Sequence, residues 1–190
     1  MILFSESCHS HFVSFFSQHD LCSNTEVVRS VLAVAREVTN PIHSKCLEIL
    51  CNFSRFPPNT YILGRFDGMI DTLISASNSA PGENRLNSLR CLQNMSADPS
   101  CKSLLATSQV LNLMTTCAMR KEVAEKEVAV ATIYNITTEP SAVAAITNTK
   151  NVVATLVHLA HSPESSSKIR LLSCEALATI SLWLQTLAGT

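Results

Sequence analysis

The chain has 190 residues, of which 46% are hydrophobic and only four are glycine, so it is long enough to bury a core and too apolar to stay disordered. Fourteen Lys and Arg against fifteen Asp and Glu give a formal net charge of −1, which excludes a strongly basic surface for nucleic acid or for an anionic membrane. Charged residues make up 15% of the chain, below the roughly 25% of an average soluble domain. We therefore expect more chain or a partner to cover part of its apolar surface.

The N-terminal residues carry no recognisable targeting signal. No Lys or Arg precedes the apolar start at residues 1–4, and no clear small-residue cleavage site follows it, so a secretory signal is not expected. Ser, Asn, Arg or Glu interrupts each apolar stretch before it reaches the roughly 18 residues of a membrane span. We predict a cytoplasmic protein, with the nucleus as the alternative location, and no membrane partner.

Residues 1–24 are expected to be helical, although they show no clear register. They contain a loose group of residue types that bind zinc, namely Cys8, His9, His11, His19 and Cys22. Their spacing fits no standard zinc site. Scattered polar residues on a terminal helix explain the group better, so we predict no metal.

Two interleaved series of chain breaks share one period. Pro58, Pro99 and Pro140 stand 41 residues apart. The second series has steps of 40, 41 and 41 residues and consists of Pro41, Pro81, Glu122 and Pro163. A repeat of this length is typical of helical-repeat proteins. We predict a single domain, 1–190, made of a partial repeat 1–40, repeats 41–80, 81–121 and 122–162, and a partial repeat 163–190.

One segment of each repeat ends in the motif Leu/Ile-x-Asn-apolar-Ser/Thr. The motif occurs at residues 50–54, 92–96 and 133–137. Apolar residues at spacing i, i+3, i+6 lie along one helical face, and here they are Leu47, Leu50 and Phe53, then Leu89, Leu92 and Met95, then Val130, Ile133 and Ile136. Cys174, Leu177 and Ile180 keep the same spacing, so we predict a fourth core stripe there.

Two further helices complete each repeat. A short apolar pair follows each proline of the first series, at residues 62–63, 104–105 and 145–146, and fits a helix of two or three turns that begins near the proline. A longer segment follows with apolar positions at Met69, Ile70 and Leu73, then Val110, Leu111 and Met114, then Val152, Val153 and Leu156. Residues 26–38 match this segment. The predicted fold class is therefore all-α, with three helices per repeat.

A period near 41, three helices per unit and an Asn near the end of the third helix together resemble the armadillo repeat of the beta-catenin and importin alpha families. The resemblance covers residues 25–190. It implies a right-handed α-solenoid in which the third helices line a concave groove. The nearest competing architecture is the two-helix HEAT array, which the separate short helix after each proline disfavours.

The resemblance also implies that the groove binds an extended peptide or a protein partner. A side-chain amide carries both a donor and an acceptor, so Asn52, Asn94 and Asn135 would form a ladder that pairs with the backbone of such a ligand. The alternative is that these Asn residues hydrogen-bond their own helix ends, which is common near helix termini. Further groove candidates share the ladder's face and together add mixed charge to it: Glu48, Arg90 and their expected exposed neighbours Lys45 and Asn87.

The groove departs from the importin-like pattern, in which a Trp stands one helical turn before each Asn. The positions here are Glu48, Arg90 and Ala131, and Thr179 stands in place of a fourth Asn. We therefore do not expect binding of nuclear localisation signals.

No residue pattern indicates catalysis. None of the four glycines is spaced as a phosphate-binding loop, and no Ser or Cys lies in a nucleophile elbow. The eight cysteines form no Cys-x-x-Cys pair, and most fall inside apolar helical patterns, so we expect buried, reduced thiols. The prediction is a non-enzymatic protein without a cofactor.

Neither end of the predicted array has the polar capping repeat that a solenoid needs. Ser181 stands at the position of the repeated proline, and an apolar cluster continues the last helix: Leu182, Trp183, Leu184 and Leu187. This cluster would pack on a missing repeat, on a partner or on a second copy. The predicted function is an interaction module or scaffold, and the alternative is a structural fragment of a longer helical-repeat array that assembles through its uncapped ends.

Overall fold

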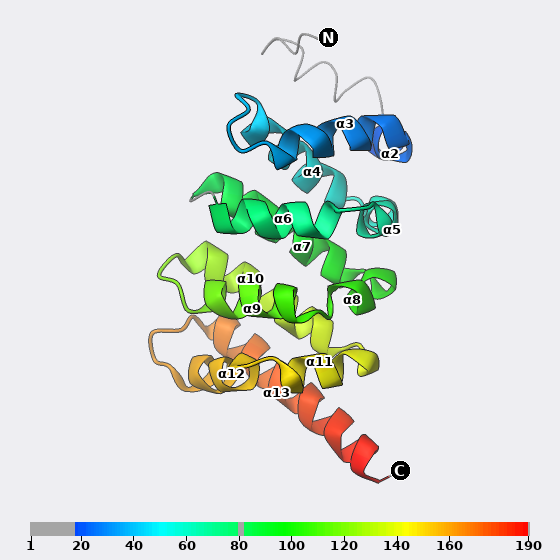
Figure 1. Cartoon of the computed structure of the whole chain (residues 1–190). Coiled ribbons are helices and arrows are strands. Elements are labelled where there is room, and N and C mark those ends of the chain that lie inside the picture. The colour runs from blue at the N-terminus through cyan, green and yellow to red at the C-terminus, as the bar shows by residue number, and fades with distance from the viewer. Residues whose placement is uncertain (1–17, 80–81, 190) are drawn as a thin grey trace.

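The computed structural model describes residues 18–79 and 82–189, and every secondary-structure element in these ranges is a helix. Figure 1 shows the helices in four tiers stacked along one direction, with the C-terminal helix leaving the last tier. The predicted all-α fold class is confirmed for the described residues. Residues 1–17, which hold most of the loose Cys/His group, lie outside the described ranges.

The first two tiers hold six helices among the described residues. Tier one consists of α2 (Gln18–Ser23), α3 (Thr25–Arg36) and α4 (His43–Ser54), and tier two of α5 (Pro57–Arg65), α6 (Met69–Ser79) and α7 (Glu83–Ala97).

The last two tiers repeat the order of a short first helix, a second helix and a longer third helix. Tier three consists of α8 (Pro99–Leu105), α9 (Ser108–Ala118) and α10 (Val123–Thr137), and tier four of the 3-10 helix η1 (Pro140–Ala142), α11 (Val143–Asn148), α12 (Val152–His161) and α13 (Ser167–Ala188).

The first helices begin at proline because their first turn needs no backbone donor at that position. Pro57, Pro99 and Pro140 each occupy the first position of α5, α8 and η1. An acidic residue precedes two of these prolines and caps the helix. The side chain of Asp98 accepts from the Ser100 amide at 2.8 Å, and that of Glu139 accepts from the Ser141 amide at 3.3 Å.

The third helices form the centre of the molecule. Consecutive third helices pack on one another, α4 on α7, α7 on α10 and α10 on α13. The three predicted stripes are confirmed as core, since all nine of their residues are buried. Each third helix in tiers two and three is covered on both sides because another third helix lies above it and below it.

The prediction of a fourth core stripe was wrong for two of its three residues. Cys174 is exposed and Leu177 is half-buried. The buried side chains of α13 are instead Ile169, Ser173, Ala176 and Ile180. Among the described residues α13 packs on α10, α11 and α12, so only the face toward these helices is covered.

Helix α13 is also longer than the other third helices. It runs for 22 residues without a break at Ser181, and Figure 1 shows its end projecting beyond the fourth tier. By length and composition alone it could cross a membrane, which we did not expect, because Arg and Glu interrupt the apolar sequence.

The thiols follow the burial of the helices that carry them. Six of the seven described cysteines are buried: Cys22, Cys46, Cys51, Cys91, Cys101 and Cys117. Cys174 is the exposed one, and Cys8 lies outside the described residues.

The short first helices stack closely where α5 meets α8. The Sγ of Cys101 donates to the carbonyl oxygen of Thr60 at 3.2 Å, and the Thr60 hydroxyl lies 2.5 Å from a carboxylate oxygen of Asp98. A Cβ added to Gly64 would stand 2.6 Å from the Cys101 Sγ, which is closer than real Cβ contacts come. The glycine therefore lets the two helices approach.

We expect Gly64→Ala to lower the free energy of unfolding by about 1–3 kcal/mol, because it overpacks a buried contact. In a Cys101→Ala background the same change should raise stability, since the sulfur is gone and alanine favours a helix by up to about 1 kcal/mol over glycine. Urea unfolding of the four proteins measures this change of sign. Gly189→Ala, which meets no atom closer than 3.6 Å, is the control and should leave the midpoint unchanged. A loss of stability by Gly64→Ala in both backgrounds would contradict the account.

Candidate functional site

The three Asn residues of the repeated motif lie in equivalent places. Asn52, Asn94 and Asn135 each occupy the last turn of a third helix, α4, α7 and α10. Each side chain is half-buried. The stacking of the third helices therefore places the three amides on successive tiers, as the ladder prediction requires.

The side-chain amides of Asn94 and Asn135 each donate a hydrogen bond to the tier above. The Nδ2 of Asn94 donates to the Oγ of Ser54 at 2.9 Å, and the Nδ2 of Asn135 donates to the Oγ of Ser96 at 3.0 Å. The acceptor is the Ser of the same motif, about 40 residues earlier in the chain. Neither the groove prediction nor the capping alternative included this partner.

The Ser hydroxyls are oriented to accept these hydrogen bonds. Ser54 donates its own hydrogen to the carbonyl oxygen of Cys51 at 2.7 Å, and Ser96 donates to that of Gln93 at 2.6 Å. With the hydroxyl hydrogen fixed on the helix, the oxygen lone pairs face the incoming amide. The motif thus encodes an inter-tier tie, with the donor on one repeat and the acceptor on the previous one.

The tie leaves part of each amide for a ligand. A primary amide has two N–H donors and an oxygen with two lone pairs, and the bond to Ser uses one N–H. The remaining N–H and the Oδ1 can serve one donor and one acceptor of an extended backbone. Because the tie fixes the amide's orientation, a ligand would meet a preorganised group rather than a free rotor.

The ladder ends at tier four with a different residue. Thr179 stands in place of a fourth Asn, and its hydroxyl donates to the carbonyl oxygen of Glu175 in the same helix at 2.8 Å. Trp183 takes over the tie, since its Nε1 donates to the carbonyl oxygen of Thr137 at 3.1 Å. This bond requires the uninterrupted extension of α13, because Trp183 lies beyond the position where the other third helices end.

Three of the flanking groove candidates form ion pairs. Lys45 and Glu48 form an ion pair at 3.2 Å, and Arg90 pairs with Glu83 at 3.4 Å. Exposed pairs of this kind contribute little to stability, so they can rearrange around a ligand. The prediction of Asn87 as an exposed neighbour was wrong. Asn87 is buried because α7 packs against α4, α6 and α10.

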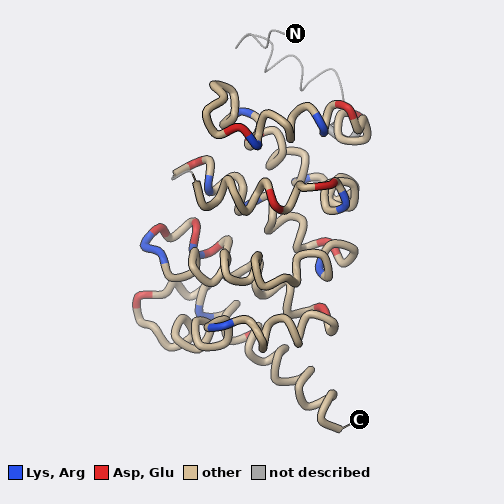
Figure 2. The backbone as a smooth tube through the Cα atoms, viewed as in Figure 1, with Lys and Arg blue, Asp and Glu red and all other residues tan. Residues whose placement is uncertain are grey.

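The charged residues do not gather by sign. Figure 2 shows Lys and Arg interspersed with Asp and Glu along the tiers, without a long run of either. A ladder face with these neighbours has no strong preference for an acidic or a basic ligand, in agreement with the composition.

A buried ion cluster beside the N-terminal end of α10 joins tiers two and three. Glu125 is buried, and its two carboxylate oxygens lie 3.4 Å from Arg85 and 3.7 Å from Arg120. Arg85 also donates to the carbonyl oxygen of Ser77 at 2.8 Å. Breaking a buried pair leaves an uncompensated charge, so this cluster resists displacement of one tier against the next. Local sequence patterns did not indicate this cluster, because Arg85 lies 35 residues from Arg120 and 40 residues from Glu125.

The buried thiols are unreactive at neutral pH. Burial raises the pKa of the Cys91 thiol to about 12 despite a side-chain hydrogen bond with Ser54 that opposes the shift, and burial raises the pKa of the Cys22 thiol to about 12. A thiol must be deprotonated to act as a nucleophile or as a metal ligand. At neutral pH these groups serve as small apolar core residues.

Three shallow grooves that the sequence did not predict lie between the second helices. The groove between α6 and α9 has a volume of about 410 Å³ and carries mostly polar side chains, namely Asp71, Ser75, Asn78, Gln109, Asn112 and Thr116. Similar grooves of about 400 and 290 Å³ lie between α9 and α12 and between α3 and α6. The exposed polar positions of the second helices were the available signal.

The residues of the predicted C-terminal cluster differ in burial. Leu182, Leu184 and Leu187 are exposed, whereas Trp183 is half-buried against α10. Leu184 and Leu187 lie on the part of α13 that projects beyond tier four.

Comparison with known proteins informs on the fold. No protein-family model matches the chain. No curated protein matches it either. Among solved structures it is similar to an engineered protein with a TM-score of 0.74 and 16% identity, over 85% of this chain and 65% of the other. A second engineered protein gives a TM-score of 0.71 and 15% identity, over 98% of this chain and 49% of the other. The chain thus spans less than two thirds of either, and at these identities the likeness concerns the all-helical fold alone.

The inter-tier tie should appear as an energetic coupling. We expect Asn94→Ala and Ser54→Ala each to lower the free energy of unfolding, and the double variant to lose about 1 kcal/mol less than the sum, because each single change already removes the shared hydrogen bond. A urea double-mutant cycle measures the coupling. Asn94→Ala with Ser96→Ala, two residues that do not bond each other, provides the control cycle. Additive losses in the first cycle would show that the tie is not formed.

The buried thiols should make the fold sensitive to alkali. The pKa of Cys91 is raised in the folded state, so its contribution is complete below the unfolded-state pKa near 8.5–9 and is lost as pH rises toward the folded value. From pH 7 to pH 10 we expect Cys91→Ala to lose about 1 kcal/mol less stability than the unsubstituted chain. Urea midpoints at the two pH values measure the difference. Equal losses in both proteins would contradict the assignment.

Proposed function

We propose that the chain is a non-enzymatic protein-interaction module of the armadillo type, an α-solenoid that binds an extended peptide or protein segment along the face of its third helices. The observation that carries the proposal is the ladder of half-buried amides, Asn52, Asn94 and Asn135, on successive tiers. The bonds to Ser54 and Ser96 orient two of these amides and leave donor and acceptor capacity on each.

The spacing of the tiers suits a chain in extended conformation. Packed helices lie about 8–10 Å apart, and an extended chain advances about 3.3 Å per residue. One Asn would therefore meet about every third residue of the ligand. A side chain of the ligand between two such contacts would meet the flanking pairs around Glu48 and Arg90, whose charges balance. The expected ligand is thus recognised by its backbone more than by its charge.

The expected setting is the cytoplasm or the nucleus, with a protein or peptide as partner and without a cofactor. Reduced thiols at six described positions are in keeping with this setting, because disulfides rarely form there.

A second candidate function is assembly through an end of the array. The observation in its favour is the exposed apolar side of tier four, which includes Leu171 and Leu182 with exposed fractions of 58% and 57%. Large apolar patches on a protein surface mark interaction sites.

Selection of a random dodecapeptide library on the immobilised chain supplies a probe for the ladder face. We expect a selected peptide to bind at least tenfold more weakly to Arg90→Ala/Asn94→Ala, because the double variant removes one amide and its flanking charge. Fluorescence anisotropy with the labelled peptide measures the dissociation constants, and circular dichroism verifies that the variant stays folded.

Two controls separate binding from stability. Ser54→Ala breaks the same tie from a buried position and should lower stability while leaving affinity within about threefold, less than the tenfold that corresponds to 1.4 kcal/mol. Asn78→Ala/Asn112→Ala alters the groove between α6 and α9 and should leave affinity unchanged. Peptides whose binding depends on Asn78 and Asn112 but not on Arg90 and Asn94 would place the site on the second helices and contradict the ladder proposal.

A further inference from the structure

The side of tier four that faces away from tier three is apolar at positions that are buried in tier three. On the second helices, Leu111 of α9 is fully buried, whereas Val153, 42 residues later, is 38% exposed. Thr115 is likewise buried and Val157 is exposed. Ala118, two turns after Leu111 on the same side of α9, is buried, and its counterpart Ala160 is half-buried. The other core positions of α9 keep their burial in α12. The two helices therefore differ only on the side that tier four covers in tier three.

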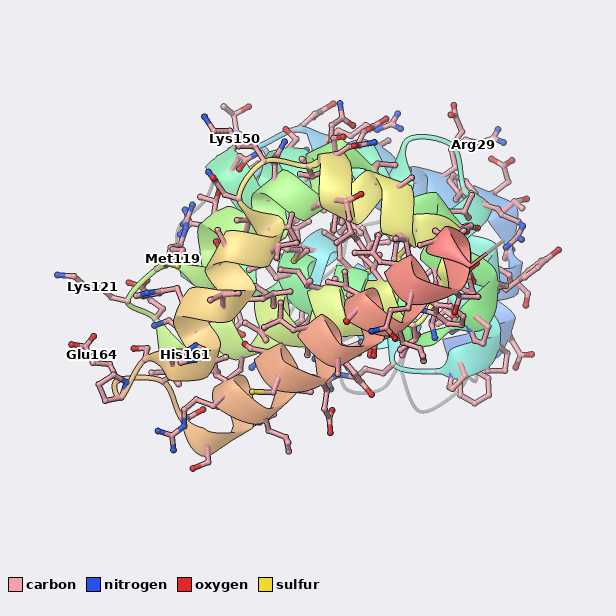
Figure 3. All side chains as sticks on the ribbon, turned by 90° about the horizontal axis from the view of Figure 1, so that it is seen from below. Arg29, Met119, Lys121, Lys150, His161 and Glu164 are labelled. Carbon is pink, nitrogen blue, oxygen red and sulfur yellow. The ribbon has the colours of Figure 1, made fainter. Side chains whose placement is uncertain are left out.

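The third helices show the same difference. Val130 and Ile133 of α10 are fully buried, whereas their counterparts 44 residues later are exposed Cys174 and half-buried Leu177. Leu171, about one turn before Cys174, is also exposed. Leu182 follows Leu171 by eleven residues, or three helical turns, and so lies on the same side of α13. We call these five residues the lower face: Val153, Val157, Leu171, Cys174 and Leu182. Seen from below, α12 and α13 lie in front of the other tiers (Figure 3).

A membrane surface fits the lower face poorly. Helices that lie on membranes carry a polar face rich in Lys and Arg. The basic residues of α13 are Lys168 and Arg170, both in its first turn. The rest of the helix holds one charged residue, Glu175.

A second copy fits the face through its charges. Lys168 and Glu175 lie on the same flank of α13, at nearly equal distances along the helix before and after Leu171, because each residue advances about 1.5 Å and turns about 100°. In an antiparallel pair of α13 helices with Leu171 at the twofold axis, each Lys168 lies opposite the partner's Glu175. The apolar lower face is then self-complementary, as an isologous interface requires.

In the described part of tier one, the exposed large hydrophobic residues are Val38 and Ile42, in the turn between α3 and α4, and α4 itself offers no apolar surface for a head-to-tail arrangement. Helix α4 has no large hydrophobic side chain that is exposed. Its Cys46 and Phe53 are buried, and Ile49 packs on the core. A closed pair is therefore favoured over an open filament.

We infer that two copies of the chain form an antiparallel, isologous dimer through the lower face, with α13 against the partner's α13 and Leu171 at the twofold axis. This inference rests on the second candidate function and names its occupant. The face holds few apolar side chains compared with the roughly 20–30 residues per side of a standard interface. We expect a dissociation constant in the micromolar range.

Sedimentation equilibrium of the full chain with Cys8→Ser, over roughly 1–200 µM, is the first measurement. We expect a monomer–dimer equilibrium without larger species. Leu171→Glu should weaken the dimer at least a hundredfold, because two carboxylates would meet at the axis. Leu184→Glu is the matched control, since Leu184 is 45% exposed on the same helix but off the lower face; it should leave the equilibrium unchanged.

Two further variants test the geometry of the pair. Lys168→Glu should weaken the dimer, and Lys168→Glu/Glu175→Lys should restore it, with thermal unfolding monitored because Lys168 also contacts Glu127. A short bismaleimide should join the two Cys174 thiols, whose backbones would be about 9 Å apart along the helix axis. Cys174→Ser should abolish the cross-link.

The outcomes separate the inference from the function on which it rests. A monomer at all concentrations overturns both. Open-ended oligomers, or a dimer that Leu171→Glu does not weaken, would uphold assembly through an end and overturn the isologous lower-face dimer. Binding of the monomer to phosphatidylcholine vesicles, lost in Leu171→Glu, would assign the face to a membrane and overturn the inference as well.

Discussion

The contact between consecutive third helices is the constraint on which the rest of the structure depends. Each contact buries an apolar stripe, such as Leu89 and Leu92 of α7, and closes a polar bond at its edge, such as that from Asn94 to Ser54. The first and second helices are too short to bury a core alone, and they reach the core by packing beside a third helix. A chain break every 40 or 41 residues follows from this arrangement, because each third helix must return to the same side of the stack.

The repeated Asn joins two functions that are usually separate. It ties one tier to the previous one, and it presents the unused part of the same amide at the surface. A substitution there would change stability and recognition together, whereas a substitution of the buried Ser partner would change stability more than recognition. Selection for packing could thus maintain a set of oriented amides before any ligand used them. The tie at tier four uses the indole of Trp183 instead, so the ladder has no fourth amide to offer.

Local periodicity predicted those parts of the fold that depend on neighbours close in sequence. The stripes through Leu50, Leu92 and Ile133 are core, and the prolines open the short helices, because both features require only helical spacing. Cys174 was predicted wrongly since spacing describes a face but not whether anything covers it. The partners of Asn94 and Glu125 were missed because they lie some 40 residues away. The grooves between second helices were missed for a related reason, as they arise from the gap between two tiers.

Trp183 gives the last junction an optical signature of its own. It is the single tryptophan of the sequence, and its indole hydrogen bond to Thr137 spans tiers three and four. Its emission therefore senses the local environment of α13, whereas far-ultraviolet circular dichroism averages over every helix. In an array whose stability is a sum of nearest-neighbour terms, the two signals need not change together. The difference between them would report how far the terminal tier opens before the remaining tiers unfold.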